Sequence, residues 1–281
     1  MSITKIPPRP ELMPDSASFA AIRRPLGATG VAVSRIGISS SFGADERVFS
    51  AAFERGCNYF TWGTFIRGRS RPFVDFFKNT ITADRRQDIV VGLLSYSHLK
   101  LWSNYFLHTA LRRLGTEYID VLLLGYYPKR PPKRILDWAA EAKQRGLIRA
   151  VGLTTHNRAL VAELALDPLV DVIHFRYNAV HRGAEQDIFP YVADTDIGLI
   201  SFTATCWGKL VRSGKAKPDT PPASAGDCYR FVLSRPEIDC CMMGVKNLAM
   251  LNENLDELDK GEMSEPERRR MCALGDHLRG A

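Results

Sequence analysis

The sequence predicts a single-domain α/β fold, a (β/α)₈ TIM barrel with an N-terminal β-hairpin. From residue 35 onward, eight short apolar runs rich in Val, Ile and Leu alternate with eight helix-like stretches. The runs are apolar almost throughout, which is typical of parallel strands covered on both faces. With 281 residues, of which 45% are hydrophobic, the chain is long enough to bury one such core.

The predicted elements begin with a Pro-rich tail at residues 1–21, and the barrel domain follows at residues 22–281. The hairpin pairs residues 22–26 with residues 31–34 across the turn sequence Gly-Ala-Thr-Gly. The strands are expected at residues 35–40, 57–61, 88–94, 118–124, 148–153, 171–176, 197–202 and 238–243. The helices are expected near residues 45–55, 71–82, 101–114, 131–145, 157–166, 184–194, 224–234 and 247–258. The Gly- and Pro-rich segment 213–226 is either a lid over the site or a plain connector.

Composition and charge narrow the classes of function. The formal net charge is +7, but the Lys and Arg residues are scattered and accompany no nucleic-acid-binding motif, so we expect no nucleic-acid partner. No apolar run approaches the ~20 residues of a membrane-spanning helix. Because the N-terminus also lacks the apolar core of a signal peptide, we expect a cytoplasmic protein with no membrane partner. The six cysteines show no CxxC pair and no metal-ligand spacing, which favours buried reduced thiols and no metal site.

Six short segments carry a resemblance to a known family. They are residues 26–37 (LGATGVAVSRIG), 56–60 (GCNYF), 111–120 (LRRLGTEYID), 146–152 (GLIRAVG), 176–178 (RYN) and 253–254 (EN). In this order they resemble motifs of the aldo-keto reductases, and together they span about residues 24–258. The resemblance implies the same barrel fold that the alternation of elements predicts.

In that family a hydride passes from NADPH to a carbonyl carbon while a Tyr phenol supplies the proton. A phenol titrates near ~10, so a Lys stabilises its anion, an Asp holds the Lys, and a His polarises the carbonyl. The matching positions of this chain carry Thr61 for Asp, Ile66 for Tyr, Leu94 for Lys and Gly125 for His. None of the four can perform its family role, so the resemblance implies a scaffold that has lost the catalytic tetrad.

Sliding the alignment by a few residues does not restore the tetrad. No Tyr occurs between residues 59 and 96, and no Lys between residues 78 and 100. No Asp or Glu occurs between residues 54 and 75, and no His between residues 108 and 156.

A nucleotide site is a separate question, because the family holds NADPH largely through the last two strands and the helix that follows. Lys246 and Asn247 match the residues near the 2′-phosphate, and Glu253 and Asn254 match the pair near the adenine. Helix N-termini attract phosphates in general. Asn247 can equally be a simple helix cap, and Glu253 can lie on a solvated face.

Near the nicotinamide the match is weaker, so NADPH is a doubtful cofactor. Thr154 and Ser201 keep hydrogen-bonding groups, whereas His174 stands where the family has Gln. The carboxamide of a nicotinamide would be poorly held there.

Substitute catalytic groups are expected at or just beyond strand ends, where barrel sites are built. The candidates are Tyr126, His156, His174 and Arg176. The two His residues could act as acids or bases, or they could be hydrogen-bonded structural groups. Arg176 binds an anionic ligand if it points into the barrel and is a rim residue otherwise.

The leading hypothesis is therefore an aldo-keto reductase homologue that is not a competent carbonyl reductase. It would be a binding or accessory protein for a small molecule in the barrel cleft, or would catalyse a different reaction there. The alternative is an NADPH-dependent oxidoreductase of carbonyl compounds with an unconventional proton donor, Tyr126 or His156. The sequence fixes neither the ligand nor the oligomeric state.

Overall fold

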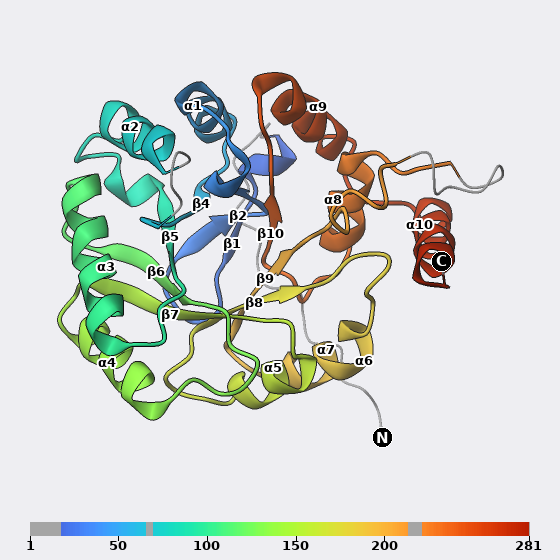
Figure 1. Cartoon of the computed structure of the whole chain (residues 1–281). Coiled ribbons are helices and arrows are strands. Elements are labelled where there is room, and N and C mark those ends of the chain that lie inside the picture. Colours follow the sequence, from blue (N-terminus) through green and yellow to red (C-terminus); the bar gives the residue numbers. More distant parts are fainter. Residues whose placement is uncertain (1–17, 66–69, 213–220, 281) are drawn as a thin grey trace.

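The computed structural model describes residues 18–65, 70–212 and 221–280 (Figure 1). Eight parallel strands form a closed barrel in the order β10-β3-β4-β5-β6-β7-β8-β9, with helices on the outside (Figure 1). The predicted (β/α)₈ barrel is confirmed. Ile66, most of the predicted tail and residues 213–220 of the predicted lid or connector lie outside the described residues.

Each predicted strand range overlaps one strand of the barrel. The strands are β3 (Ile36–Ser39), β4 (Tyr59–Trp62), β5 (Val90–Ser95), β6 (Ile119–Leu124), β7 (Ile148–Thr155), β8 (Val172–Arg176), β9 (Gly198–Phe202) and β10 (Cys240–Met243). Their neighbours are in parallel register, for example Gly37 with Tyr59 and Tyr59 with Val90.

The helices cover the outer face of the barrel. They are α1 (Glu46–Glu54), α2 (Arg71–Thr80), α3 (Lys100–Leu114), α4 (Lys133–Gln144), α5 (Arg158–Leu164), α6 (Ala184–Asp187), α7 (Phe189–Val192), α8 (Ala225–Leu233), α9 (Leu248–Leu258) and α10 (Glu265–Gly280). Three short 3₁₀ turns occur in the described part, η1 (Phe19–Ala21), η2 (Ser40–Phe42) and η3 (Arg86–Asp88).

Two helical regions differ from the prediction. The single helix predicted at residues 184–194 is divided into α6 and α7, because Ile188 leaves helical geometry and Pro190 has no N–H to continue the hydrogen bonds. No helix is predicted beyond residue 258, yet α10 ends the described chain. A Cβ atom at Gly275 would lie 2.0 Å from the carbonyl oxygen of Ala179, so glycine lets α10 approach the loop after β8.

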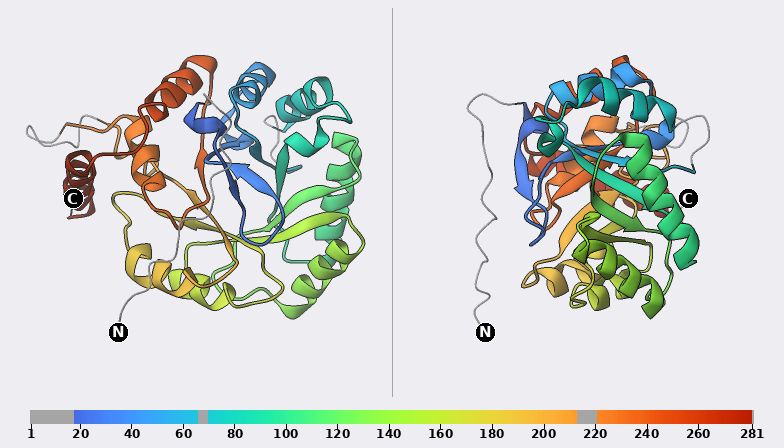
Figure 2. Two further views of the ribbon diagram at one scale, coloured as in Figure 1. Left: turned by 180° about the vertical axis from the view of Figure 1, so that it is seen from behind. Right: turned by 90° about the vertical axis from the view of Figure 1, so that its left-hand side faces the viewer.

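A hairpin closes the N-terminal end of the barrel, as predicted (Figure 2). It consists of β1 (Arg23–Pro25) and β2 (Ala32–Ser34), which pair antiparallel. Leu26, Val31 and Val33 pack into the same cluster as the side chains that fill the barrel interior. Side chains therefore fill the interior at this end of the barrel, and we expect a ligand site at the opposite, C-terminal end.

Tyr59 fills the centre of the barrel. Cβ atoms at Gly37 and Gly92 would lie within 2.8 Å of its side chain, so these glycines provide the space for it. Its hydroxyl lies 2.9 Å from Nε2 of His174 and forms a hydrogen bond that joins β4 to β8 across the interior. Burial raises the pKa of Tyr59 well above its usual value and lowers the pKa of His174 to about 3, so both side chains are neutral near pH 7.

Replacing Tyr59 with Phe is expected to destabilise the barrel by about 1–3 kcal/mol, because it leaves a buried His174 nitrogen without a partner. Urea denaturation measures the change. Tyr105→Phe on α3 removes the same atom from a side chain that is 52% exposed, and should change the free energy of unfolding little. Equal stability of the two variants would contradict the role given to the hydrogen bond.

The described residues also bear on membrane spans, metal sites and cysteine pairing. Within the described ranges, no helix combines the length and apolar character needed to cross a bilayer. The described part also holds no cluster of three or more His, Cys, Asp or Glu side chains suited to a metal ion. All six cysteines are free thiols, and five of them are buried.

Candidate functional site at the C-terminal end of the barrel

Three of the four positions that the resemblance matches to the family tetrad lie on the inner face of the barrel. Thr61 is 4% exposed near the end of β4, and Leu94 packs against the interior cluster from β5. Gly125 follows β6 two residues after Leu123, which also points inward, so all three positions face the mouth of the barrel. Ile66, the fourth position, is outside the described residues.

A tyrosine ring covers the position that the family gives to His. A Cβ atom at Gly125 would lie 2.8 Å from Cε1 of Tyr96, which follows β5. The Tyr96 ring also contacts Phe65 edge to face, with the ring centroids 5.3 Å apart. The first residue after β6 thus carries no side chain and lies beneath a neighbouring ring.

His156 lies between two aromatic rings beyond the end of β7. The centroid distances are 5.0 Å to Tyr126 and 5.2 Å to Phe202. Its Nδ1 is buried and has no hydrogen-bond partner among the described residues, and the same holds for Oγ1 of Thr154. Burial, assisted by the Arg176 charge, lowers the pKa of His156, so a neutral imidazole lines this part of the site.

The other two candidate catalytic residues, His174 and Arg176, have different surroundings. His174 is buried and bonded to Tyr59, which supports the structural alternative for this residue. Arg176 is half-buried at the end of β8, and its guanidinium carbon lies 5.7 Å from the ring centroid of Trp207. Within the described ranges, Arg176 has no hydrogen bond and no ion pair.

The loop after β9 holds Trp207 in an unusual backbone conformation. Thr203, Cys206 and Trp207 have φ values of 61°, 50° and 54°, a left-handed region that non-glycine residues rarely adopt. The amide nitrogen of Asn178 donates to the carbonyl oxygen of Thr203 at 2.8 Å and helps to hold the loop. Backbone strain of this kind often accompanies binding sites. Sequence reasoning missed Trp207, since only the path of the loop brings it near Arg176.

The predicted cofactor residues Lys246, Asn247, Glu253 and Asn254 lie at and along α9 and differ in exposure. Lys246 and Asn247 are exposed at the start of α9, where the Asn247 side chain caps the helix by accepting from the N–H of Met250 at 2.9 Å. Glu253 is exposed, whereas Asn254 is 4% exposed. The structure therefore presents an exposed helix N-terminus with a lysine, capped by Asn247, and only Glu253 of the Glu-Asn pair is exposed.

The two predicted nicotinamide contacts also have different surroundings. The Ser201 hydroxyl donates to the carbonyl oxygen of Tyr177 at 3.2 Å, so it is already used within the protein. Thr154 keeps its unpartnered Oγ1.

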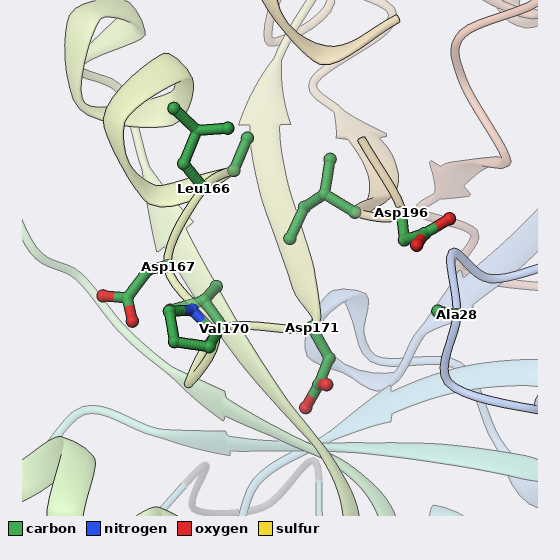
Figure 3. Close-up of a pocket in the computed structure, with 9 residues that line it drawn as sticks. Ala28, Leu166, Asp167, Val170, Asp171 and Asp196 are labelled. Atoms are coloured by element: carbon green, nitrogen blue, oxygen red, sulfur yellow. The ribbon is translucent and has the colours of Figure 1, made fainter. Parts of the chain in front are cut away.

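A cavity of about 200 Å³ lies at the other end of the barrel and does not belong to this site (Figure 3). It lies between the hairpin turn at Ala28 and the loops that precede β8 and β9. Asp167 forms an ion pair with Arg130, and Asp171 forms one with Lys143 at 2.7 Å. With these two carboxylates paired, the C-terminal end remains the better candidate for a ligand.

Comparison with known proteins agrees with this architecture. The Aldo/keto reductase family model matches residues 45–227. Aldo-keto reductases AMT2 and AFTS1 of Alternaria alternata are 29% and 26% identical to this chain over 129 residues, which are 43% of this chain. The match spans 35% of the length of each of these relatives.

Among solved structures, the holo form of aldo-keto reductase AKR11C1 from Bacillus halodurans superposes with a TM-score of 0.75 at 20% sequence identity. The match covers 90% of this chain and 95% of that one, and at this identity it shows the shared fold. The family model extends over more than half of the sequence and over most of the barrel. The chain therefore belongs to the aldo/keto reductase family.

Proposed function

We propose that this aldo/keto reductase family member does not reduce carbonyl compounds by the family reaction. Its cleft at the C-terminal end of the barrel instead binds a small molecule, as a binding or accessory protein or for a different reaction. The observation that carries the proposal is the inner face of the barrel mouth, where Thr61, Leu94 and Gly125 stand together.

Each of these residues removes one part of the proton-transfer apparatus. Leu94 has no charge to stabilise a phenolate, and Thr61 has no charge to hold a cation in its place. Gly125 offers no donor to polarise a carbonyl, and the Tyr96 ring already covers it. Without a positioned acid or a polarising group, hydride transfer to an ordinary carbonyl lacks its main stabilisation.

The direct test is turnover of an aldehyde panel by the pure protein with NADPH. We expect consumption of NADPH to match the protein-free rate. Robust turnover that disappears when a cleft residue such as His156 is replaced would overturn the proposal.

The alternative function, an NADPH-dependent oxidoreductase, is favoured by one observation. Lys246 and the exposed N-terminus of α9 form a surface where a phosphate could bind. Tyr126 and His156, whose rings lie 5.0 Å apart, would then have to supply the proton.

If NADPH binds at this helix, Lys246→Ala is expected to weaken NADPH by ~10-fold or more, because a charge-assisted contact to the 2′-phosphate contributes about 1.5–3 kcal/mol. NADH, which lacks that phosphate, should bind unchanged. Titration calorimetry measures both affinities, and Lys78→Ala in the last turn of α2 is the matched control. If the wild-type protein binds neither dinucleotide, the alternative function is excluded.

A further inference from the structure

Arg176 is a cation that has no anionic partner among the described residues. The Arg176 guanidinium lies against the Trp207 ring, and no carboxylate among the described residues pairs with it. A guanidinium has five donors and remains charged at all physiological pH values. Contact with an aromatic ring fixes its orientation but leaves these donors available.

A small recess lies beside this guanidinium, between the ends of β7 and β8. Its volume is about 10 Å³, and its lining includes His156, Arg158, Arg176 and His181. A volume of ~10–15 Å³ on this measure suits one water-sized atom. The recess adjoins a larger cavity of about 620 Å³, which shares His156 and Arg158 with it. A ligand could therefore place one oxygen atom in the recess and its body in the cavity.

The electrostatics of the recess favour a negative charge. Burial lowers the pKa of His181 to about 4, and the charges of Arg176, Arg279, Lys209 and Arg158 contribute to the same shift. The acid that lines the larger cavity, Asp187, accepts a hydrogen bond from Nε of Arg158 at 2.6 Å. That pair neutralises itself, so an excess of positive charge remains around Arg176 and His181.

Two further observations point to a bound group. Nδ1 of His156 is buried without a partner, and His156 lines both the recess and the larger cavity. Trp207 is 55% exposed and reaches Arg176 only because its loop adopts the left-handed conformation described above. A buried unpaired nitrogen and a strained loop are both costly, and both are expected where a ligand completes the structure.

We propose that this recess binds the carboxylate group of a small anionic ligand, with Arg176 donating to the carboxylate and His156 donating one further hydrogen bond. The proposal rests on the binding function proposed above, because it names the chemical class of a molecule bound at the C-terminal end of the barrel. The site lies at the rim beside α5 and α7, not above Thr61, Leu94 and Gly125. A planar carboxylate matches the fork of a guanidinium and presents a single oxygen to the recess.

The test uses benzoate, its uncharged analogue benzamide, and inorganic phosphate as probes of the full chain in the absence of NADPH. Calorimetry measures affinity, and the change in Trp fluorescence includes that of Trp207, one of four Trp residues in the chain. Arg176→Met is expected to weaken benzoate by ~10-fold or more, the effect of losing a charged hydrogen bond. Arg176→Lys keeps the charge without the fork and should lose less. Arg145→Met, an exposed arginine at the C-terminal end of α4, is the control of equal charge change and should bind as the wild type does.

Three outcomes would overturn the proposal. They are benzoate binding no tighter than benzamide, equal benzoate affinity of Arg176→Met and the wild type, and phosphate binding tighter than benzoate through Arg176. Thermal melting first establishes that the variants are folded. Because the titration contains no NADPH, its failure leaves the aldehyde test of the proposed function untouched.

Discussion

Reduction of a simple aldehyde by NADPH is expected to run ~10²–10⁴-fold more slowly with this protein than with a family member that has the complete tetrad. A missing general acid typically costs ~10²–10⁴ in rate, and a missing polarising donor costs ~10²–10³. Residues that act as a unit are not additive, so the two factors do not simply multiply. The conservative expectation is the larger single factor.

The measurement is the decrease of NADPH absorbance at high enzyme concentration with benzaldehyde. Tyr126→Phe and His156→Ala address the alternative donors, while Tyr105→Phe on α3 provides a control of similar size. A rate above background that falls tenfold or more in either cleft variant, but not in the control, would establish the alternative function instead.

Removal of the Asp120 carboxylate is expected to cost about 3–5 kcal/mol of stability, because it leaves a buried cation unpaired. Asp120 is fully buried on β6, and its Oδ2 accepts hydrogen bonds from the N–H of Val91 at 2.9 Å and from Arg86 at 2.8 Å. Arg86 is itself only 12% exposed and cannot turn freely to water. Asp120→Ala therefore leaves the Arg86 guanidinium without its carboxylate partner and the N–H of Val91 without its acceptor, while Arg86 keeps its contacts to neutral oxygens.

Urea denaturation compares Asp120→Ala with Asp137→Ala, which breaks the exposed i,i+4 ion pair of Asp137 with Lys133 on α4. The exposed pair should contribute at most about 1 kcal/mol. Asp120→Asn keeps one oxygen acceptor and should fall between the two. Similar losses in both alanine variants would show that the buried carboxylate has no special role.

The barrel itself could be predicted from sequence because its determinants are local. Residues 118–124 are apolar apart from Asp120, and this pattern indicates a strand covered on both faces. The divided helix at Ile188 could have been found from Pro190, which removes one hydrogen bond at a known place. α10 is harder to predict, because its first turns are almost entirely charged and its buried residues, Met271 and Leu274, come later.

The candidate site could be predicted only in part. Strand ends give the positions of His156 and Arg176 along the chain, but they leave the direction of the Arg176 side chain open. The approach of Trp207 to Arg176, and of Tyr96 to Gly125, depends on loops whose paths have no periodic pattern. The hydrogen bond between Tyr59 and His174 joins residues 115 positions apart, and nothing local to either residue predicts it.

The left-handed residues after β9 have a consequence for the evolution of the chain. Each such non-glycine residue costs about 1–3 kcal/mol, and this loop has three, Thr203, Cys206 and Trp207. Glycine adopts the same backbone without that penalty. Selection for thermal resistance alone would therefore favour glycine in this loop, and the same change at position 207 would remove the ring that lies over Arg176. Thermal stability and the ligand binding that we propose for Arg176 therefore place opposite demands on this short loop.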